Sequence, residues 1–211
     1  MTSFIRSTCA IVALSAISLI GPACGDPTSP VTLPLSDLKQ LHVAPDSPPL
    51  AETQVSFYAV KGQPAGADLW YHARPGQPDS LKLVEFRMGP QSLDRRPDGT
   101  SIATGDSVRI TLTATDPTHL TVDFQPSGLT FSAADQPTLR LFWVACGEDL
   151  NYDGAVNEAD TTLALRFSIW RQEVPGDPWT KMPSLVTPGV KEVASTLGGF
   201  TGYAILYERD R

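Results

Sequence analysis

The sequence has few histidines, no basic stripe and no long apolar run, and each shortage excludes a class of protein. His42, His72 and His119 lie far apart and form no pair at metal-ligand spacing, so we expect isolated structural or surface side chains. Lys and Arg number 16 against 23 Asp and Glu, a net charge of −7, which argues against nucleic acid as a partner. Neither a Gly-rich phosphate loop nor an acid–base pair of carboxylates can be recognised. We therefore predict a protein that is not an enzyme.

The N-terminal residues have the composition of a secretory signal. Residues 9–20 are apolar but too few to span a bilayer, and the small residues Gly21 and Ala23 suit a cleavage site before Cys24. A cysteine directly after such a site resembles the bacterial lipobox. The resemblance implies that residues 1–23 are a lipoprotein-type signal peptide and that a lipid on Cys24 attaches the protein to a membrane of the cell envelope. Because the lipobox family usually has Leu, Val or Ile where this chain has Gly21, a secreted form without lipid and an uncleaved anchor remain alternatives.

Cysteine is too scarce for a disulfide framework. Of the three cysteines, Cys9 leaves with the signal and Cys24 would carry the lipid, so Cys146 has no partner. We expect Cys146 to be a small buried apolar residue.

The rest of the chain has the patterns of a tether and of strands. Residues 24–50 are rich in proline, which predicts an extended tether. From residue 51 to 211, apolar and polar residues alternate in short runs separated by Pro–Gly turns, and this favours half-buried strands. The clearest runs are 55–59, 84–88, 108–114, 120–124, 139–143, 163–169 and 203–207. We predict an all-β fold, an antiparallel β-sandwich over residues 51–211.

Residues 149–160 carry the most specific motif. Oxygen donors recur at alternate positions of a twelve-residue loop with a glycine, Gly154, at its sixth position, and calcium is a hard cation that takes 6–8 oxygens. We expect Val156 to anchor the loop. The predicted calcium ligands are Asp149, Asn151, Asp153, Ala155 through its carbonyl, Asn157 and Asp160. A solvated acidic loop that binds nothing is the alternative.

This run resembles the EF-hand loop, and more closely its dockerin version. A dockerin has two such loops, each leading into a helix, whereas here the flanking residues alternate like strands. We therefore predict that the calcium loop caps a β-hairpin, which argues against the cohesin-binding role of dockerins.

Two further stretches look like the ZU-five domain of zonula occludens proteins and netrin receptors. The first is residues 124–131 with 138–141, and the second is residues 199–204. The resemblance implies a β-sandwich with a structural or protein-binding role. Some ZU-five domains cleave themselves at a His-Phe-Ser motif, and the matching residues here are Gly199, Phe200 and Thr201. Gly199 cannot act as a base, so self-cleavage is the most distant alternative, and Phe200 is expected in the core.

Together these features predict an envelope-anchored, calcium-stabilised structural or adhesion lipoprotein whose partner is an unidentified protein or glycan. The main alternative is a carbohydrate-binding module, which would need an exposed row of aromatic side chains. Adjacent aromatic pairs such as Trp70-Tyr71 place one residue on each side of a strand, but burial of Trp70, Trp143, Trp170 and Trp179 is the simpler expectation.

Overall fold

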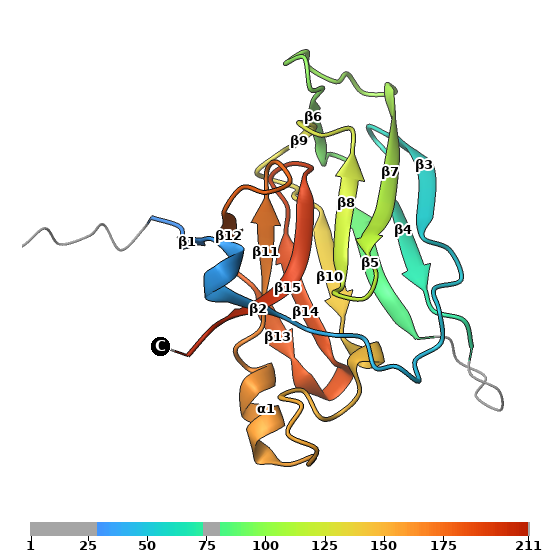
Figure 1. The fold of residues 1–211 in the computed structure, drawn as a ribbon. Helices are drawn as coiled ribbons and strands as arrows, with labels where there is room; N and C mark the ends of the chain where they lie inside the picture. The colour runs from blue at the N-terminus through green and yellow to red at the C-terminus, as the bar shows by residue number, and fades with distance from the viewer. Residues whose placement is uncertain (1–28, 74–80, 211) are drawn as a thin grey trace, which may run out of the picture.

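The computed structural model describes residues 29–73 and 81–210, and strands dominate them (Figure 1). The signal peptide predicted for residues 1–23 and the lipidation site predicted at Cys24 lie outside these residues. The strands are β1 (Thr32–Leu33), β2 (Leu38–Gln40), β3 (Gln54–Val60), β4 (Ala65–Trp70), β5 (Lys82–Met88), β6 (Leu93–Arg95), β7 (Ser107–Asp116), β8 (Thr121–Gln125), β9 (Thr130–Phe131), β10 (Thr138–Phe142), β11 (Ser168–Gln172), β12 (Trp179–Lys181), β13 (Leu185–Thr187), β14 (Glu192–Thr196) and β15 (Gly202–Glu208). One α-helix, α1 (Glu158–Ala164), and three short 3-10 turns, η1 (Leu35–Asp37), η2 (Val144–Cys146) and η3 (Pro188–Val190), complete the elements of this part.

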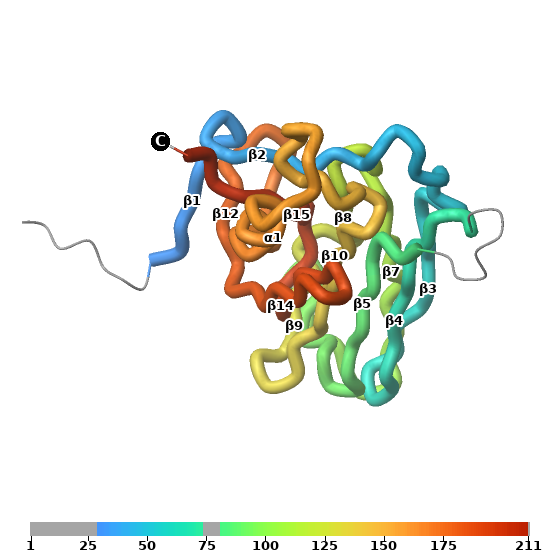
Figure 2. Tube along the Cα trace, turned by 90° about the horizontal axis from the view of Figure 1, so that it is seen from below, coloured from blue at the N-terminus to red at the C-terminus, as the bar shows by residue number. Residues whose placement is uncertain are grey.

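Within the described residues the strands form two layers of antiparallel sheet. The larger sheet has eight strands in the order β1-β12-β11-β15-β8-β7-β3, with β2 also paired to β15. The smaller sheet has five strands in the order β13-β14-β10-β5-β4, and β6 pairs with β9 separately. The two layers lie face to face (Figures 1 and 2). The all-β sandwich predicted from the alternating runs is confirmed.

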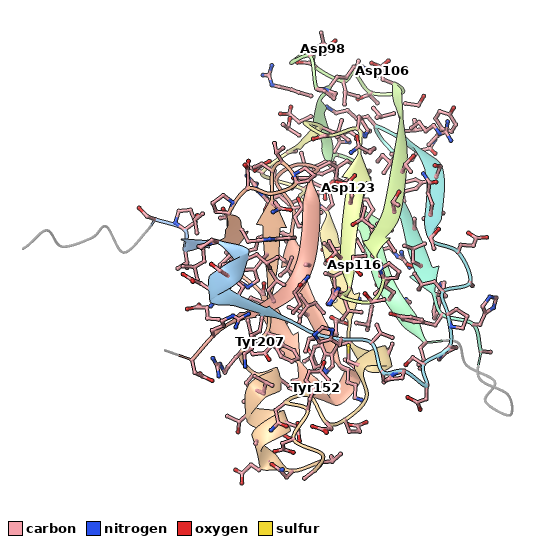
Figure 3. All side chains as sticks on the ribbon, viewed as in Figure 1. Asp98, Asp106, Asp116, Asp123, Tyr152 and Tyr207 are labelled. Atoms are coloured by element: carbon pink, nitrogen blue, oxygen red, sulfur yellow. The ribbon has the colours of Figure 1, made fainter. Side chains whose placement is uncertain are left out.

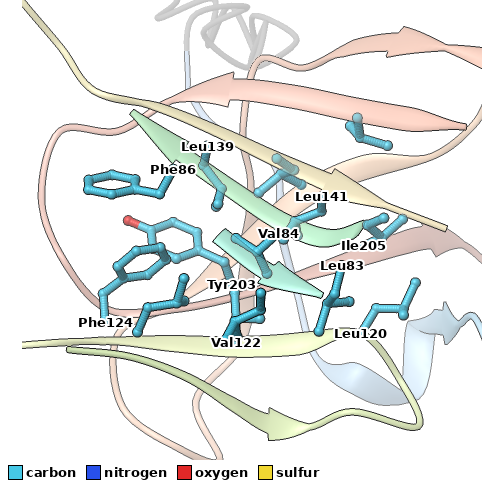
Figure 4. Packing of buried hydrophobic residues seen from close by; sticks show 14 of the residues in the cluster. Leu83, Val84, Phe86, Leu120, Val122, Phe124, Leu139, Leu141, Tyr203 and Ile205 are labelled. Atoms are coloured by element: carbon cyan, nitrogen blue, oxygen red, sulfur yellow. The ribbon is translucent and has the colours of Figure 1, made fainter. Parts of the chain in front are cut away.

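The core lies between the sheets and is filled by the inward residues of the alternating strands (Figure 4). Phe86 of β5 and Phe124 of β8 come from opposite sheets, and their ring centroids are 4.9 Å apart. Phe200 stacks on Phe124 at 4.8 Å, and the Tyr203 hydroxyl donates a hydrogen bond of 2.5 Å to the Gly199 carbonyl. The interleaved aromatic rings fix how the two sheets face each other, because each ring fills space left by the other sheet.

The tether predicted for residues 24–50 is wrong over its described part, because the chain joins the larger sheet from Thr32 onward. The strand β1 pairs with β12, and β2 pairs with β15. Leu38 packs with Trp170 and Leu206 on the outer face of this sheet, and Leu41 is fully buried in the main core. The sandwich therefore begins before residue 51. Proline frequency suggested an extended chain, but the leucines between the prolines bury enough apolar surface to hold it against the sheet.

Residues 163–169, predicted to be a strand, instead contain the end of α1, a tight turn and the start of β11. The Asn157 side chain accepts a hydrogen bond from the Ala159 N–H, and the Asp160 carboxylate accepts one from the Asn157 N–H, which together form a capping box. Leu163 is buried whereas Leu165 is 62 % exposed, so their alternation in sequence has no counterpart in the fold. Local capping thus overrides the first half of an alternation whose second half, Phe167 and Ile169, is buried at the start of β11 and just before it.

The predicted position of the loop at the tip of a β-hairpin is also wrong. The preceding strand, β10, belongs to the smaller sheet, and the following strand, β11, belongs to the larger one. The segment from η2 to α1 therefore crosses from one layer to the other at one end of the sandwich (Figure 1). Among the described residues, no helix has the length and apolar character needed to cross a bilayer.

Candidate functional site

The loop at residues 149–160 is anchored by its second residue, Leu150. Leu150 is buried in the main core with Ala145 and Cys146 of η2, and Leu163 of α1 joins the same cluster. Val156, which was expected to anchor the loop, is 67 % exposed. The loop is therefore fixed at both ends, and the polar residues between them lie at the surface.

Three of the predicted calcium ligands are drawn together by hydrogen bonds to the loop backbone. Both Asp149 carboxylate oxygens accept N–H groups, from Asp153 at 3.2 Å and from Gly154 at 2.9 Å. The Asn151 side-chain oxygen accepts the Asp153 N–H at 2.9 Å, and Asp153 Oδ1 accepts the Ala155 N–H at 2.8 Å. Gly154 has φ of 86°, the left-handed region that glycine enters without strain. The backbone is thus folded around the side-chain oxygens of residues 149, 151 and 153.

The other predicted ligands lie on the helix side of the loop. Asn157 donates through its side-chain amide to the Ala155 carbonyl at 3.3 Å and caps α1. Asp160 is buried, and its carboxylate accepts N–H groups from Leu150 at 2.7 Å, Asn151 at 3.2 Å and Asn157 at 2.9 Å. These hydrogen bonds, with that of Asn157 foremost, hold the pKa of Asp160 below its usual range despite the opposing effect of burial. Asp160 therefore ties the start of the loop to its end.

The loop contains oxygen donors of the kind that calcium prefers, but its carboxylates are turned toward its own backbone. Within residues 29–73 and 81–210, no three His, Cys, Asp or Glu side chains converge as a metal-binding group. Each carboxylate oxygen that accepts one N–H still has a further lone pair. Asp149, Asn151 and Asp153, with the Ala155 carbonyl, are the residues of this loop that could hold a cation. One oxygen of the buried Asp160 carboxylate accepts two N–H groups and the other accepts one, so only the second oxygen keeps a free lone pair.

The loop also contacts the N-terminal segment, which sequence analysis did not predict. Tyr152 has φ of 61°, a conformation that costs a non-glycine residue about 1–2 kcal/mol. Its hydroxyl accepts the His42 N–H at 2.8 Å and donates to the His42 carbonyl at 3.3 Å. Tyr152 and Tyr207 line one groove of about 560 Å³ beside β2 (Figure 3). The loop therefore holds the chain just after β2.

Two histidines that are distant in the sequence meet beside this contact. The His42 and His119 rings are 4.5 Å apart, edge to face, and His119 Nδ1 lies 2.6 Å from an Asp116 oxygen. Burial raises the pKa of Asp116, but hydrogen bonds from Thr118 and His119 outweigh it, so the net shift is downward. The expectation of isolated histidines is wrong for this pair. The segment after β2 contacts the turn between β7 and β8, where the Val43 N–H donates to the Thr118 carbonyl at 2.9 Å, and sequence spacing does not show this contact.

Phe200, Thr201 and the four tryptophans are the residues on which the self-cleavage and carbohydrate-binding alternatives depend. Phe200 lies in the core as expected, and the Thr201 hydroxyl donates a hydrogen bond to the Gln172 carbonyl. Trp143, Trp170 and Trp179 are buried, so Trp70, at 39 % exposure, is the single tryptophan with substantial solvent contact. These four tryptophans therefore do not form the exposed row of aromatic side chains that the carbohydrate alternative required.

The chain was compared with protein-family models, curated proteins and solved structures, and no match was found in any of the three.

Proposed function

We propose that this chain is a calcium-stabilised β-sandwich lipoprotein of the cell envelope, with a structural or adhesive role and no catalytic one. The observation that carries the proposal is the arrangement of Asp149, Asn151 and Asp153, whose side-chain oxygens are gathered within one loop by its own backbone. Calcium is the common cation that best suits such a set of hard oxygen donors.

The course of the chain after the loop adds support. EF-hand loops lead into a helix, and the loop of this chain leads into α1. Asn157 and Asp160 cap that helix, so the ninth and twelfth loop positions are fixed relative to Asp149. A bound ion would join the two ends of the crossing between the sheets, and would thereby stabilise the sandwich instead of exposing a new surface.

Calcium should raise the melting temperature of the protein. Extracellular calcium modules bind with Kd of about 10⁻⁴–10⁻³ M, so about 10 mM calcium should add roughly 1.4–2.7 kcal/mol of stability. For a domain of this size, that free energy corresponds to a rise of roughly 3–11 °C.

The experiment compares melting curves in EDTA, calcium and magnesium for the wild type and two variants. Asp153→Ala should lose the calcium-dependent rise. Asp98→Ala is the matched control, because Asp98 makes a similar local turn, accepting the Thr100 N–H at 2.9 Å, but at a site outside the loop. A wild-type melting temperature unaffected by calcium would refute the calcium site and leave the solvated-loop alternative.

The envelope location rests on the N-terminal sequence and has its own test. Cys24 precedes Thr32, the first residue of β1, by eight residues, which reach at most about 29 Å when extended. A lipid on Cys24 would therefore hold the sandwich close to the membrane surface. Cys24→Ser should move the protein from the membrane fraction to the soluble fraction, and an unchanged membrane fraction would contradict the lipid anchor.

A further inference from the structure

A groove of about 570 Å³ lies on the outer face of the larger sheet, away from the loop at residues 149–160. It lies between β8 and the segment that follows β11, and Asp123 marks its β8 side in Figure 3. The residues that matter for its chemistry are Thr121, Asp123, Gln125, Gln172, Val174 and Gly202.

The groove exists because a central strand carries a glycine where its neighbours carry polar side chains. Gly202 of β15 pairs with Gln172 of β11 on one side and with Asp123 of β8 on the other. Two strand spacings separate the backbones of Gln172 and Asp123 by about 9.5 Å. Because Gly202 has no side chain, a gap one residue wide separates these two polar side chains on the sheet surface, and we call this gap the trough.

Neither the backbone nor the local packing requires glycine at this position. Gly202 is not among the residues with positive φ. A Cβ added there would lie 3.5 Å from the Gln172 carbonyl oxygen and 4.0 Å from that of Val122, which are ordinary contacts. Glycine also costs strand stability relative to a β-branched residue. Neither the backbone conformation nor the space around a Cβ therefore accounts for glycine here, and its lack of a side chain leaves the groove open at this point.

Neighbouring groups hold the polar side chains of the groove in place. The Gln125 amide donates to Asp123 Oδ2 at 2.7 Å, and the Gln125 oxygen accepts the Ser127 N–H at 3.0 Å. The Gln172 amide donates to the Asp177 carbonyl at 2.6 Å. Each of these side chains keeps further donor or acceptor capacity. Apolar surface is supplied by Val174, which is 57 % exposed, and by Pro175, whereas Trp179 is buried beneath the groove.

The charge and the backbone pairing of the groove limit what it can bind. Its ionisable lining residues are Asp123 and Glu173, and Glu173 is already paired with Arg171, so anions are disfavoured. The strands beneath the groove are interior strands with neighbours on both sides, so an extended peptide cannot add to them as a further strand. Sugar hydroxyls both donate and accept, and they match amide, hydroxyl and carboxylate groups beside an apolar wall.

We propose that this groove binds a neutral saccharide, with one pyranose ring lying over Gly202 between Gln172 and Asp123. This site names a ligand for the binding role proposed above. It uses no residue of the calcium loop, so either proposal can fail without the other.

Isothermal titration calorimetry with hexasaccharides of glucose, xylose, mannose and N-acetylglucosamine, and with an oligogalacturonate as the anionic probe, tests the site. At least one neutral oligosaccharide should bind and the anionic one should not. Gly202→Val fills the trough and should weaken binding by about tenfold or more, with the melting temperature unchanged or raised. Asp123→Ala should weaken binding similarly.

Two control variants separate the outcomes. Ser56→Val alters the outer face of the same sheet on β3, and should bind as the wild type does. Asp153→Ala should also bind normally, which distinguishes this site from the calcium loop. The proposal is overturned if no neutral oligosaccharide binds, if the anionic probe binds equally well, or if Gly202→Val leaves the affinity unchanged.

Discussion

Replacing Leu41 with alanine should destabilise the protein by about 2–5 kcal/mol, the usual cost of removing a buried leucine side chain and leaving a cavity. Leu41 follows β2 and has no solvent exposure within the main core. For a domain of this size each kcal/mol lowers the melting temperature by about 2–4 °C, so a fall of roughly 4–20 °C is expected. A proline-rich tether would give no such effect, because a side chain in a tether is exposed in both the folded and the unfolded state.

The same segment supplies a matched control and an independent second site. Leu35 is 44 % exposed in η1, so Leu35→Ala should change stability by no more than about 0.5 kcal/mol. Leu38 is buried in the separate outer cluster with Trp170 and Leu206, so Leu38→Ala should add to Leu41→Ala in the double variant.

Urea unfolding followed by circular dichroism measures the wild type and the four variants, and a shifted midpoint with an unchanged slope reports stability alone. Equal midpoints for Leu41→Ala and Leu35→Ala would refute the docking of this segment.

Three other predictions concern the loop and its surroundings. The folded-state pKa of Asp160 lies below its unfolded value of about 3.9. The stability that its carboxylate contributes is therefore complete above about pH 3.9 and is lost as the pH falls through the folded-state pKa. Acid unfolding of Asp160→Asn should accordingly show a weaker pH dependence than that of the wild type in this acidic range. Burial raises the pKa of the Cys146 thiol to about 12, so a thiol reagent should react with it at pH 8 only after urea unfolding, and rapid labelling of the folded protein would contradict this burial. Tyr152→Phe removes the hydroxyl that holds the His42 backbone. It should lower the free energy of unfolding by about 0.5–1.5 kcal/mol and speed hydrogen exchange of the His42 amide. Tyr58→Phe, at a residue that is 68 % exposed, should change neither the stability nor that exchange rate.

The burial pattern of the long strands was available from the sequence alone. Val108, Ile110 and Leu112 alternate with polar residues in sequence and are buried in β7, because successive side chains of a strand point to opposite faces. The loop at residues 149–160 was also visible, since Asp, Asn and Gly at fixed spacing fold the backbone locally. The helix after it had a local signal too, the Asn157 and Asp160 capping box, but the alternation of apolar residues over 163–169 favoured a strand there.

Which segments meet was decided only by the tertiary structure. Leu38 and Leu41 lie in a proline-rich stretch, and their burial depends on β15, at the other end of the chain. Strand register brings Gln172 and Asp123 to either side of Gly202, whereas Tyr152 meets His42, and His42 meets His119, through contacts between loops. Local spacing determines the period of a strand and the conformation of a turn. Long-range pairing is determined by the packing of all strands at once, so no single stretch of sequence records it.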